Sequence, residues 1–358
     1  MSTPALFDRN AIRVGALTAF LVLLLIFAGS RQLRDFDWAV TTYAVGSVFA
    51  AFAIAYRYAV WAQRPPTMMY LKRGWQAFTR RRLRLPRNGV VLGRLLLDNF
   101  FLQRFITGRG TRRWIMHACL SWGGMLAFAL TFPLVFGWIH FETAPDNAQI
   151  YRVFLFGFPV EQFPVNSLTG FLHFNMLNFS AVLMLIGLAL SVSLRASDKG
   201  ELATQTFADD VLPLLLLFTV SVTGLMLSVS SHFMAGSGFQ FIGMAHAASV
   251  IGLLLYLPFG KLFHIVQRPL SLGVSFYREA GQEGAKARCL RCGDDYASAM
   301  HVADLKLVLD ELGFNYRFAT PQGEIHYQDI CPPCRRRLLA LNQEKHLSLR
   351  ERSARSAG

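Results

Sequence analysis

Long runs of hydrophobic residues alternate with polar stretches along most of the chain. A helix rises 1.5 Å per residue, so about 20 apolar residues cross a hydrocarbon core about 30 Å thick. The first run is longer than the hydrophobic part of a signal peptide and lacks a cleavage site, so we expect it to remain as a helix. We predict six membrane-spanning helices: Ala11–Gly29, Trp38–Trp61, Trp114–Trp138, Leu168–Leu194, Val211–His232 and Phe239–Val266.

The hydrophobic pattern changes after Arg268, and the last 80 residues (279–358) are polar and charged with no apolar run of spanning length. Short periodic segments and turn residues there indicate a small α+β domain with a flexible end. We expect a helix over Asp304–Leu312, strands over Asn315–Thr320 and Glu324–Gln328 around the turn Pro321-Gln322-Gly323, and a basic helix over Cys334–Gln343.

The predicted fold class is therefore an all-α integral membrane bundle of six transmembrane helices, followed by a small cytoplasmic α+β domain. The predicted parts are two N-terminal helices (1–62), a basic loop (63–113), a four-helix core (114–268) and the C-terminal domain (279–358). No internal repeat is visible.

Composition agrees with a membrane protein, because 53% of the 358 residues are hydrophobic and only 16% are charged. The net charge of +14 is concentrated in residues 63–113, which hold thirteen Lys and Arg residues, whereas residues 140–167 hold only Arg152. The positive-inside rule places the basic loop in the cytoplasm. Six spans then place both termini there, in a multi-pass protein of the cytoplasmic membrane. Because the loop lies between spans, we expect anionic lipid headgroups or an acidic subunit as its partner, and no nucleic acid.

Two histidines in the last apolar segment, His246 and His264, are 18 residues apart. Eighteen residues make five helical turns and rise about 27 Å, so a continuous helix would present one imidazole near each membrane surface, on one face. Ionisable residues inside a membrane are costly and are candidates for function. The pair is typical of two haem b groups stacked across the bilayer, and the simpler alternative is two interfacial histidines with hydrogen-bonded neighbours.

Each six-coordinate haem b requires a second axial imidazole. His117 begins the third span at the same expected depth as His264, so we pair these two at the inner haem. For His246 at the outer haem we favour His173, at the start of the fourth span. His140 and His232 are the alternatives; they lie at span ends, where water can satisfy them.

The residues around these histidines resemble one known family. The stretch LPFGKLFHIVQRPLSLGVSFYRE (Leu257–Glu279) is similar to the last span and tail of γ subunits of respiratory nitrate reductases, and RRWIMHACLSWGGML resembles their other ligand helix. The resemblance covers about 210 residues and implies a five-span diheme cytochrome b with a cytoplasmic C-terminus, in which His117 is a ligand.

The chain departs from this family in three ways. Ala127 stands where the family has a second histidine, ten residues after His117, so the outer haem must take a ligand elsewhere or be absent. The basic residue that the family places near its quinol site has no clear counterpart, and Arg152 is the only nearby cation. The first span and the C-terminal domain are additional.

Four cysteines in the C-terminal domain form the pairs Cys289-Leu-Arg-Cys292 and Cys331-Pro-Pro-Cys334. Two CxxC pairs at this separation predict a four-cysteine metal site. Disulfides are disfavoured in a reducing cytoplasm, and neither pair is followed by the His of a haem c motif. Zinc is favoured, since so small a domain needs a metal or a covalent link; iron or an iron–sulfur cluster is the alternative.

These features predict the diheme membrane anchor of a respiratory oxidoreductase. It would exchange electrons between the quinone pool and cytoplasmic iron–sulfur and catalytic subunits. The chain has no nucleotide-binding glycine loop, catalytic triad or paired intramembrane carboxylates. The alternative is a membrane transporter, or an assembly or scaffold protein, with a regulatory zinc domain.

Overall fold

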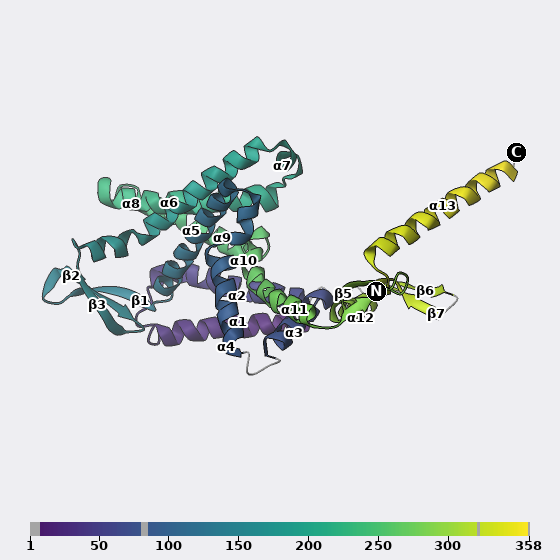
Figure 1. Cartoon of the computed structure of the whole chain (residues 1–358). Coiled ribbons are helices and arrows are strands. Elements are labelled where there is room, and N and C mark those ends of the chain that lie inside the picture. The colour runs from purple at the N-terminus through teal and green to yellow at the C-terminus, as the bar shows by residue number, and fades with distance from the viewer. Residues whose placement is uncertain (1–7, 80–84, 321–322, 357–358) are drawn as a thin grey trace. The chain divides into compact units, whose positions relative to one another are not determined.

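The computed structural model describes residues 8–79, 85–320 and 323–356, and most of them are helical (Figure 1). Six helical segments are long and apolar enough to cross a membrane, in the six predicted places. They are α1 (Arg9–Gly29), η1 with α2 (Trp38–Val40, Thr41–Ala62), α5 (Thr111–Val135), α6 (Leu168–Ser197), η5 with α8 (Phe207–Val211, Leu212–Phe233) and α9 (Phe239–Tyr256).

The chain forms two compact units, each built from two stretches of sequence. The first unit comprises Met1–Val60 and Val91–Pro269, and the second comprises Trp61–Val90 and Leu270–Gly358. All six candidate spans lie in the first unit, apart from the last two residues of α2. The short elements of the first unit are η3 (Leu97–Phe101), η4 (Arg104–Arg109), α7 (Lys199–Thr204), η6 (Lys261–Phe263), α10 (His264–Gln267) and the first half of η7 (Arg268–Ser271).

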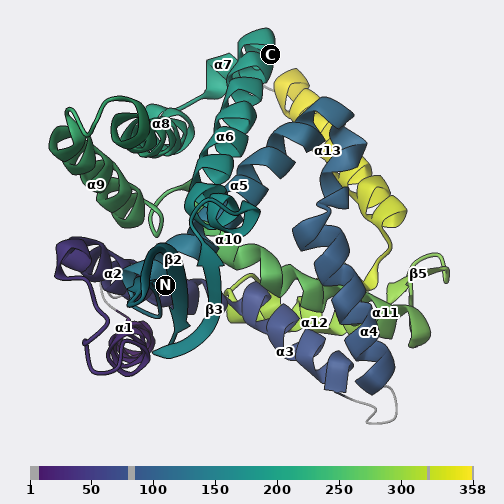
Figure 2. The same ribbon diagram turned by 90° about the vertical axis from the view of Figure 1, so that its left-hand side faces the viewer.

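Small residues let the helices of the first unit pack closely. Figure 2 shows α5 beside α6 and α8 beside α9. A Cβ on Gly123 would lie 3.0 Å from the backbone N of Met184, and a Cβ on Gly187 would lie 2.8 Å from Leu120 Cγ. Ser180 Oγ also donates to the Gly123 carbonyl at 2.8 Å. Such contacts between small residues are how helices associate where both are surrounded by lipid.

The last predicted span is interrupted, so the prediction of one helix over Phe239–Val266 is wrong. Helix α9 ends at Tyr256, and a turn leads into the 3₁₀ segment η6 and the short helix α10. Pro258 is the physical reason, because it has no N–H to continue the helix. Its carbonyl accepts a hydrogen bond from Arg57, whose guanidinium lies 4.4 Å from the Phe263 ring centroid. The five-turn argument therefore does not relate His246 to His264.

A three-stranded antiparallel sheet between α5 and α6 was not predicted, so the first unit is not purely α-helical. Its strands β1 (Ile139–Ala144), β2 (Asn147–Leu155) and β3 (Phe158–Pro164) pair in the order β1-β2-β3. Phe156 and Gly157 connect β2 to β3, and both have a positive φ (51° and 81°), as a two-residue hairpin turn requires.

The second unit contains the C-terminal domain together with part of the predicted basic loop, which is mostly helical. Helix α3 packs against α11 so closely that a Cβ on Gly74 would lie 2.7 Å from the Gly273 carbonyl oxygen. The elements are α3 (Pro65–Thr79), the start of α4 (Leu85–Leu96), α11 (Leu272–Glu283), β4 (Lys286–Arg288), β5 (Asp295–Ser298), α12 (Ala299–Glu311), β6 (Arg317–Thr320), β7 (Gly323–His326), η8 (Tyr327–Asp329) and α13 (Pro332–Ser356).

The secondary structure predicted for the soluble domain is confirmed in type and order. Helix α12 contains all but the last residue of the expected helix, β6 and β7 form the expected hairpin, and α13 is the expected basic helix. Two of the three predicted turn residues, 321 and 322, lie outside the described residues.

A buried ion pair joins α3 to α12 in the second unit. Asp304 is only 1% exposed, and its Oδ1 accepts from Arg73 Nε at 2.9 Å and from Nη2 at 2.6 Å. Tyr277 on α11 donates to Asp304 Oδ2 at 3.1 Å. Burial, and then the charge of Asp304, raise the pKa of the Tyr277 hydroxyl, so it remains a donor at neutral pH.

Replacing Arg73 with Met is expected to destabilise the second unit by about 3 kcal/mol. The substitution would leave the buried Asp304 carboxylate without its cation. We expect the lower end of the usual cost, because the Arg73 side chain is 39% exposed and solvent already weakens the pair. Arg87→Met is the matched control, because its 2.8 Å pair with Glu279 is solvent-exposed and should contribute about 0–1 kcal/mol. Limited proteolysis in urea measures both variants, and equal effects would contradict the importance of the buried pair.

Candidate functional site

His117 lies in the second turn of α5, and its Nδ1 is 2.6 Å from the side-chain oxygen Oε1 of Gln103. Gln103 Nε2 donates to the Phe100 carbonyl at 3.5 Å, which turns Oε1 toward the imidazole. The Gln103 side chain is almost fully buried, and its backbone has a φ of 52° between η3 and η4. His117 Nδ1 is therefore the donor, and Nε2 is left as the basic nitrogen.

His264 has the same arrangement at the start of α10. Its Nδ1 lies 2.6 Å from the Lys261 carbonyl oxygen, so Nδ1 carries the proton and Nε2 is again left basic. The 3₁₀ turn of η6 places that carbonyl three residues before the histidine. Histidines that bind metals commonly have the other ring N–H donated to an oxygen in this way.

His117 and His264, the two residues predicted as the inner pair, both lie in the first unit. His264 and Arg268 both lie within electrostatic range of the His117 imidazole. The Arg268 guanidinium is 4.2 Å from the Phe105 ring centroid, and the Phe105 ring meets the His117 ring edge to face, with centroids 6.0 Å apart. Burial, and then the neighbouring Arg109, lower the pKa of Arg268. These residues combine two imidazoles, an aromatic ring and two cations.

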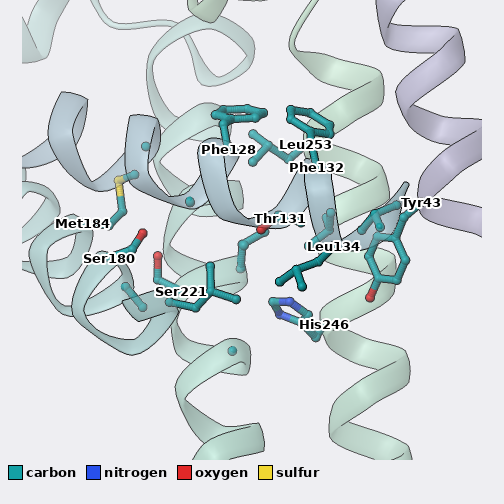
Figure 3. Close-up of a pocket in the computed structure, with 18 of the residues that line it drawn as sticks. Tyr43, Phe128, Thr131, Phe132, Leu134, Ser180, Met184, Ser221, His246 and Leu253 are labelled. Carbon is teal, nitrogen blue, oxygen red and sulfur yellow. The ribbon is translucent and has the colours of Figure 1, made fainter. Parts of the chain in front are cut away.

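His246 on α9 lines a different space, a cavity of about 470 Å³ among α2, α5, α6, α8 and α9 (Figure 3). Its Nδ1 lies 2.9 Å from Thr223 Oγ1 on α8. The Thr223 hydroxyl donates its own proton to the Thr219 carbonyl at 2.6 Å, so its oxygen accepts from His246 Nδ1. Ala127 of α5 lines the same cavity.

His173, the predicted partner of His246, lies against the β-sheet. Its Nδ1 donates to the Thr169 carbonyl at 2.9 Å, its Nε2 is 3.4 Å from Glu161 Oε2, and its ring stacks on Phe163 with centroids 4.8 Å apart. It is not among the described residues that line the His246 cavity. The structure therefore does not bring the predicted outer pair together.

The two alternative partners of His246 also lie elsewhere. His140 on β1 stacks on Phe154 with centroids 4.9 Å apart, and its Nε2 is 3.4 Å from Glu142 Oε1. His232 is exposed at the end of α8 and donates from Nδ1 to the Ser228 carbonyl at 2.9 Å. Within the described chain, His246 is the single histidine in the lining of this cavity.

The four predicted cysteine ligands converge in the second unit. The Sγ atoms of Cys289, Cys292, Cys331 and Cys334 all lie within 4.8 Å of one another, a spacing that one metal ion can bridge. Cys289 and Cys331 are buried, Cys334 is half-buried and Cys292 is exposed. Gly293 follows the first pair with a φ of 78°, which a glycine adopts without strain.

The backbone around Cys289 favours the thiolate form of this residue. Cys331 N–H and Arg291 N–H point to Cys289 Sγ at 3.2 and 3.4 Å. Burial raises the pKa of the Cys289 thiol, but these N–H groups and that of Cys292 outweigh burial and hold its pKa at about 6. The cluster packs on Ile330 and Tyr296, so it also forms a small hydrophobic core with them.

Comparison with known proteins found no matching family model, no similar curated protein and no similar solved structure. The resemblance to nitrate reductase γ subunits therefore remains a prediction from two short sequence motifs. Function must be argued from the geometry of the two histidine sites and of the cysteine cluster.

Sequence reasoning did not identify the residues that orient these histidines. Thr223 carried a weak signal, because it is a hydroxyl residue on an apolar span. Gln103 and Arg268 carried no sequence signal that distinguishes them from the other polar residues between the apolar runs.

Proposed function

We propose that this chain is a membrane cytochrome b that holds a haem between His117 and His264. It would serve as the membrane anchor of a respiratory oxidoreductase and exchange electrons between quinone and cytoplasmic iron–sulfur and catalytic subunits. The single observation that carries the proposal is the shared geometry of two imidazoles within electrostatic range of each other, each with Nδ1–H donated to an oxygen 2.6 Å away and Nε2 left to bind iron.

The residues around the pair fit a haem b. Gln103 and the Lys261 carbonyl fix the orientation and tautomer of the two rings, which makes Nε2 a better ligand. Phe105 supplies an apolar wall, and Arg268 with Arg109 offers positive charge for carboxylate groups of the cofactor. A bound haem supplies one-electron transfer at its iron, with a potential set by ligands and burial.

We infer that the six apolar helices are inserted in the cytoplasmic membrane, with both termini and the second unit on the cytoplasmic side. Support comes from the length and hydropathy of the helices and from the thirteen basic residues in 63–113. The second unit would then lie where a soluble partner subunit can dock.

For the cysteine cluster we infer one zinc ion with a structural role. The support is the four-thiolate donor set, together with the small core that surrounds it. Iron, alone or in a cluster, is the outcome that would instead make this unit part of the electron path.

The second haem predicted at His246 has weaker support. A six-coordinate haem needs two axial ligands, and the described residues that line the His246 cavity include no second imidazole. We therefore limit the proposal to one haem with two histidine ligands.

The proposal is tested by mixing the purified, oxidised protein with a short-chain quinol under anaerobic conditions. A low-spin b-type spectrum whose α-band grows as the quinol is added is the expected result. A colourless, haem-free protein would support the transporter or scaffold alternative instead.

Replacing Gln103 with Leu is expected to weaken haem binding about 10–100-fold, because the residue that orients a ligating histidine is lost. Gln103→Glu is the matched control, since it keeps an oxygen acceptor for His117 Nδ1. Haem binding by the two variants is compared by diluting each protein, adding apo-globin as a haem acceptor and measuring the haem that the variant retains. Equal retention in the two variants would mean that Gln103 does not act on His117.

A further inference from the structure

The His246 cavity is apolar and uncharged, and most of its polar side chains are already hydrogen-bonded within the protein. No Asp, Glu, Lys or Arg is among its described lining residues. Ser221 donates to the Leu217 carbonyl at 2.8 Å, Ser180 donates to Gly123, and Asn178 Oδ1 accepts from Ser228 at 2.8 Å. A charged ligand would find no oppositely charged side chain among these residues.

Three lining groups keep hydrogen-bonding capacity that could face a ligand. His246 Nε2 is a basic acceptor, because Nδ1 donates its proton to the Thr223 hydroxyl. The Val220 carbonyl oxygen lies 3.2 Å from that hydroxyl and is a second acceptor for the imidazole N–H. The hydroxyls of Tyr43 and Thr131 form no hydrogen bond to another described residue, and both side chains border the cavity (Figure 3). An acceptor and two hydroxyls thus lie in one apolar space.

The size and walls of the cavity limit the ligand further. Its volume of about 470 Å³ lies within the range of about 300–1,000 Å³ typical of small-molecule sites. Phe128 and Phe132, stacked with centroids 5.2 Å apart, form one aromatic wall. The cavity lies among helices apolar enough to span a membrane, which favours an apolar ligand that dissolves in lipid.

We propose that this cavity binds the ring of a quinol, in its reduced dihydroxy form, in place of a second haem. One quinol hydroxyl donates to His246 Nε2, and Tyr43 and Thr131 bind the second oxygen. A quinone presents only carbonyl acceptors, and Nε2 cannot donate to them, so the reduced form should bind more tightly. The inference rests on the proposed function for its quinone partner, but its geometry is independent of the His117–His264 site.

Ala127 explains why a ring rather than a haem fits here. It is one of several α5 residues that line the cavity, and its methyl group offers no metal ligand where the resemblance places the second histidine. A haem in the cavity would have one axial imidazole and an open face, whereas a dihydroxy ring needs only one acceptor and two hydroxyl partners.

Anaerobic titration calorimetry on the purified full chain in nanodiscs tests the proposal with a short-chain benzoquinol and the matching benzoquinone. The quinol should bind about tenfold more tightly than the quinone. His246→Ala should remove that preference and weaken quinol binding about tenfold, and Thr131→Val should weaken it about threefold. Ser221→Ala is the matched control, since its hydroxyl lines the same cavity but is held by Leu217; its affinity should stay within twofold of wild type.

Haem content, measured on the same samples, separates this inference from the proposed function. If wild type carries two haems and His246→Ala loses one, the cavity is a haem site and the inference is overturned. Equal quinol affinity in His246→Ala and wild type would overturn it as well. A haem-free wild type would refute the proposed function, while the quinol titration would still decide the cavity's ligand. If His246→Ala does not fold, Thr131→Val and Tyr43→Phe supply the same comparison.

Discussion

His264→Ala is expected to purify without the low-spin haem, and His117→Ala is expected to show the same loss. His117 and His264 would each supply one imidazole to the haem iron, so either substitution would remove one of the two ligands that hold the cofactor. Both rings are held by 2.6 Å hydrogen bonds through Nδ1, so in each variant the remaining imidazole should keep its orientation while the second ligand is lost.

His232→Ala is the control for this pair of variants. His232 is also a histidine near the end of a candidate span with Nδ1 donated to a carbonyl, but it is exposed and lies outside the site. It should keep the full haem-to-protein ratio and the wild-type spectrum. If His264→Ala also keeps the full ratio, His264 is not a ligand and the proposed haem site is wrong.

Cys331→Ser is expected to abolish metal binding and to unfold the C-terminal part of the second unit. Cys331 is buried in the small core with Cys289 and Ile330, and a serine would leave a three-thiolate site beside a buried hydroxyl. Structural zinc contributes about 10–16 kcal/mol of apparent folding free energy in zinc-finger peptides at pH 7, more than a domain of this size holds in reserve.

Elemental analysis with limited proteolysis measures this effect, and Cys119→Ser in α5 is the control. Wild type and Cys119→Ser should carry one zinc per chain and resist cleavage after residue 284, whereas Cys331→Ser should lose both properties. The haem spectrum should not change if zinc is structural. Iron in excess of the haem would instead make the cluster redox-active, and four thiols that alkylate rapidly in the native wild type would mean that no metal binds.

Much of the fold could be predicted from sequence, because the strongest signals are local. Apolar runs located all six long helices, and the CxxC spacing located a cluster whose sulfur atoms converge within 4.8 Å. The hairpin of β6 and β7 was predicted from its turn residues. Each of these signals is local, because an apolar run is continuous in sequence and each CxxC pair or turn lies within a few residues.

Some features were missed because two signals in one segment point to different structures. Others were missed because they depend on contacts between residues that are far apart in sequence. Pro258 ends α9 within an apolar run that hydropathy alone reads as continuous. The three-stranded sheet lies in a segment treated only as a loop, although Phe156-Gly157 provides a hairpin turn. Pairing His173 with His246 relied on expected depth, and depth cannot reveal that Glu161 and Phe163 hold the His173 ring.

The haem-to-protein molar ratio of the purified wild-type chain, measured as the pyridine haemochrome, tests the central claim most directly. We predict one haem b per chain and, in the native protein before pyridine is added, a low-spin spectrum typical of two imidazole ligands. A ratio of zero in protein that is folded and carries its four-cysteine metal would contradict the account.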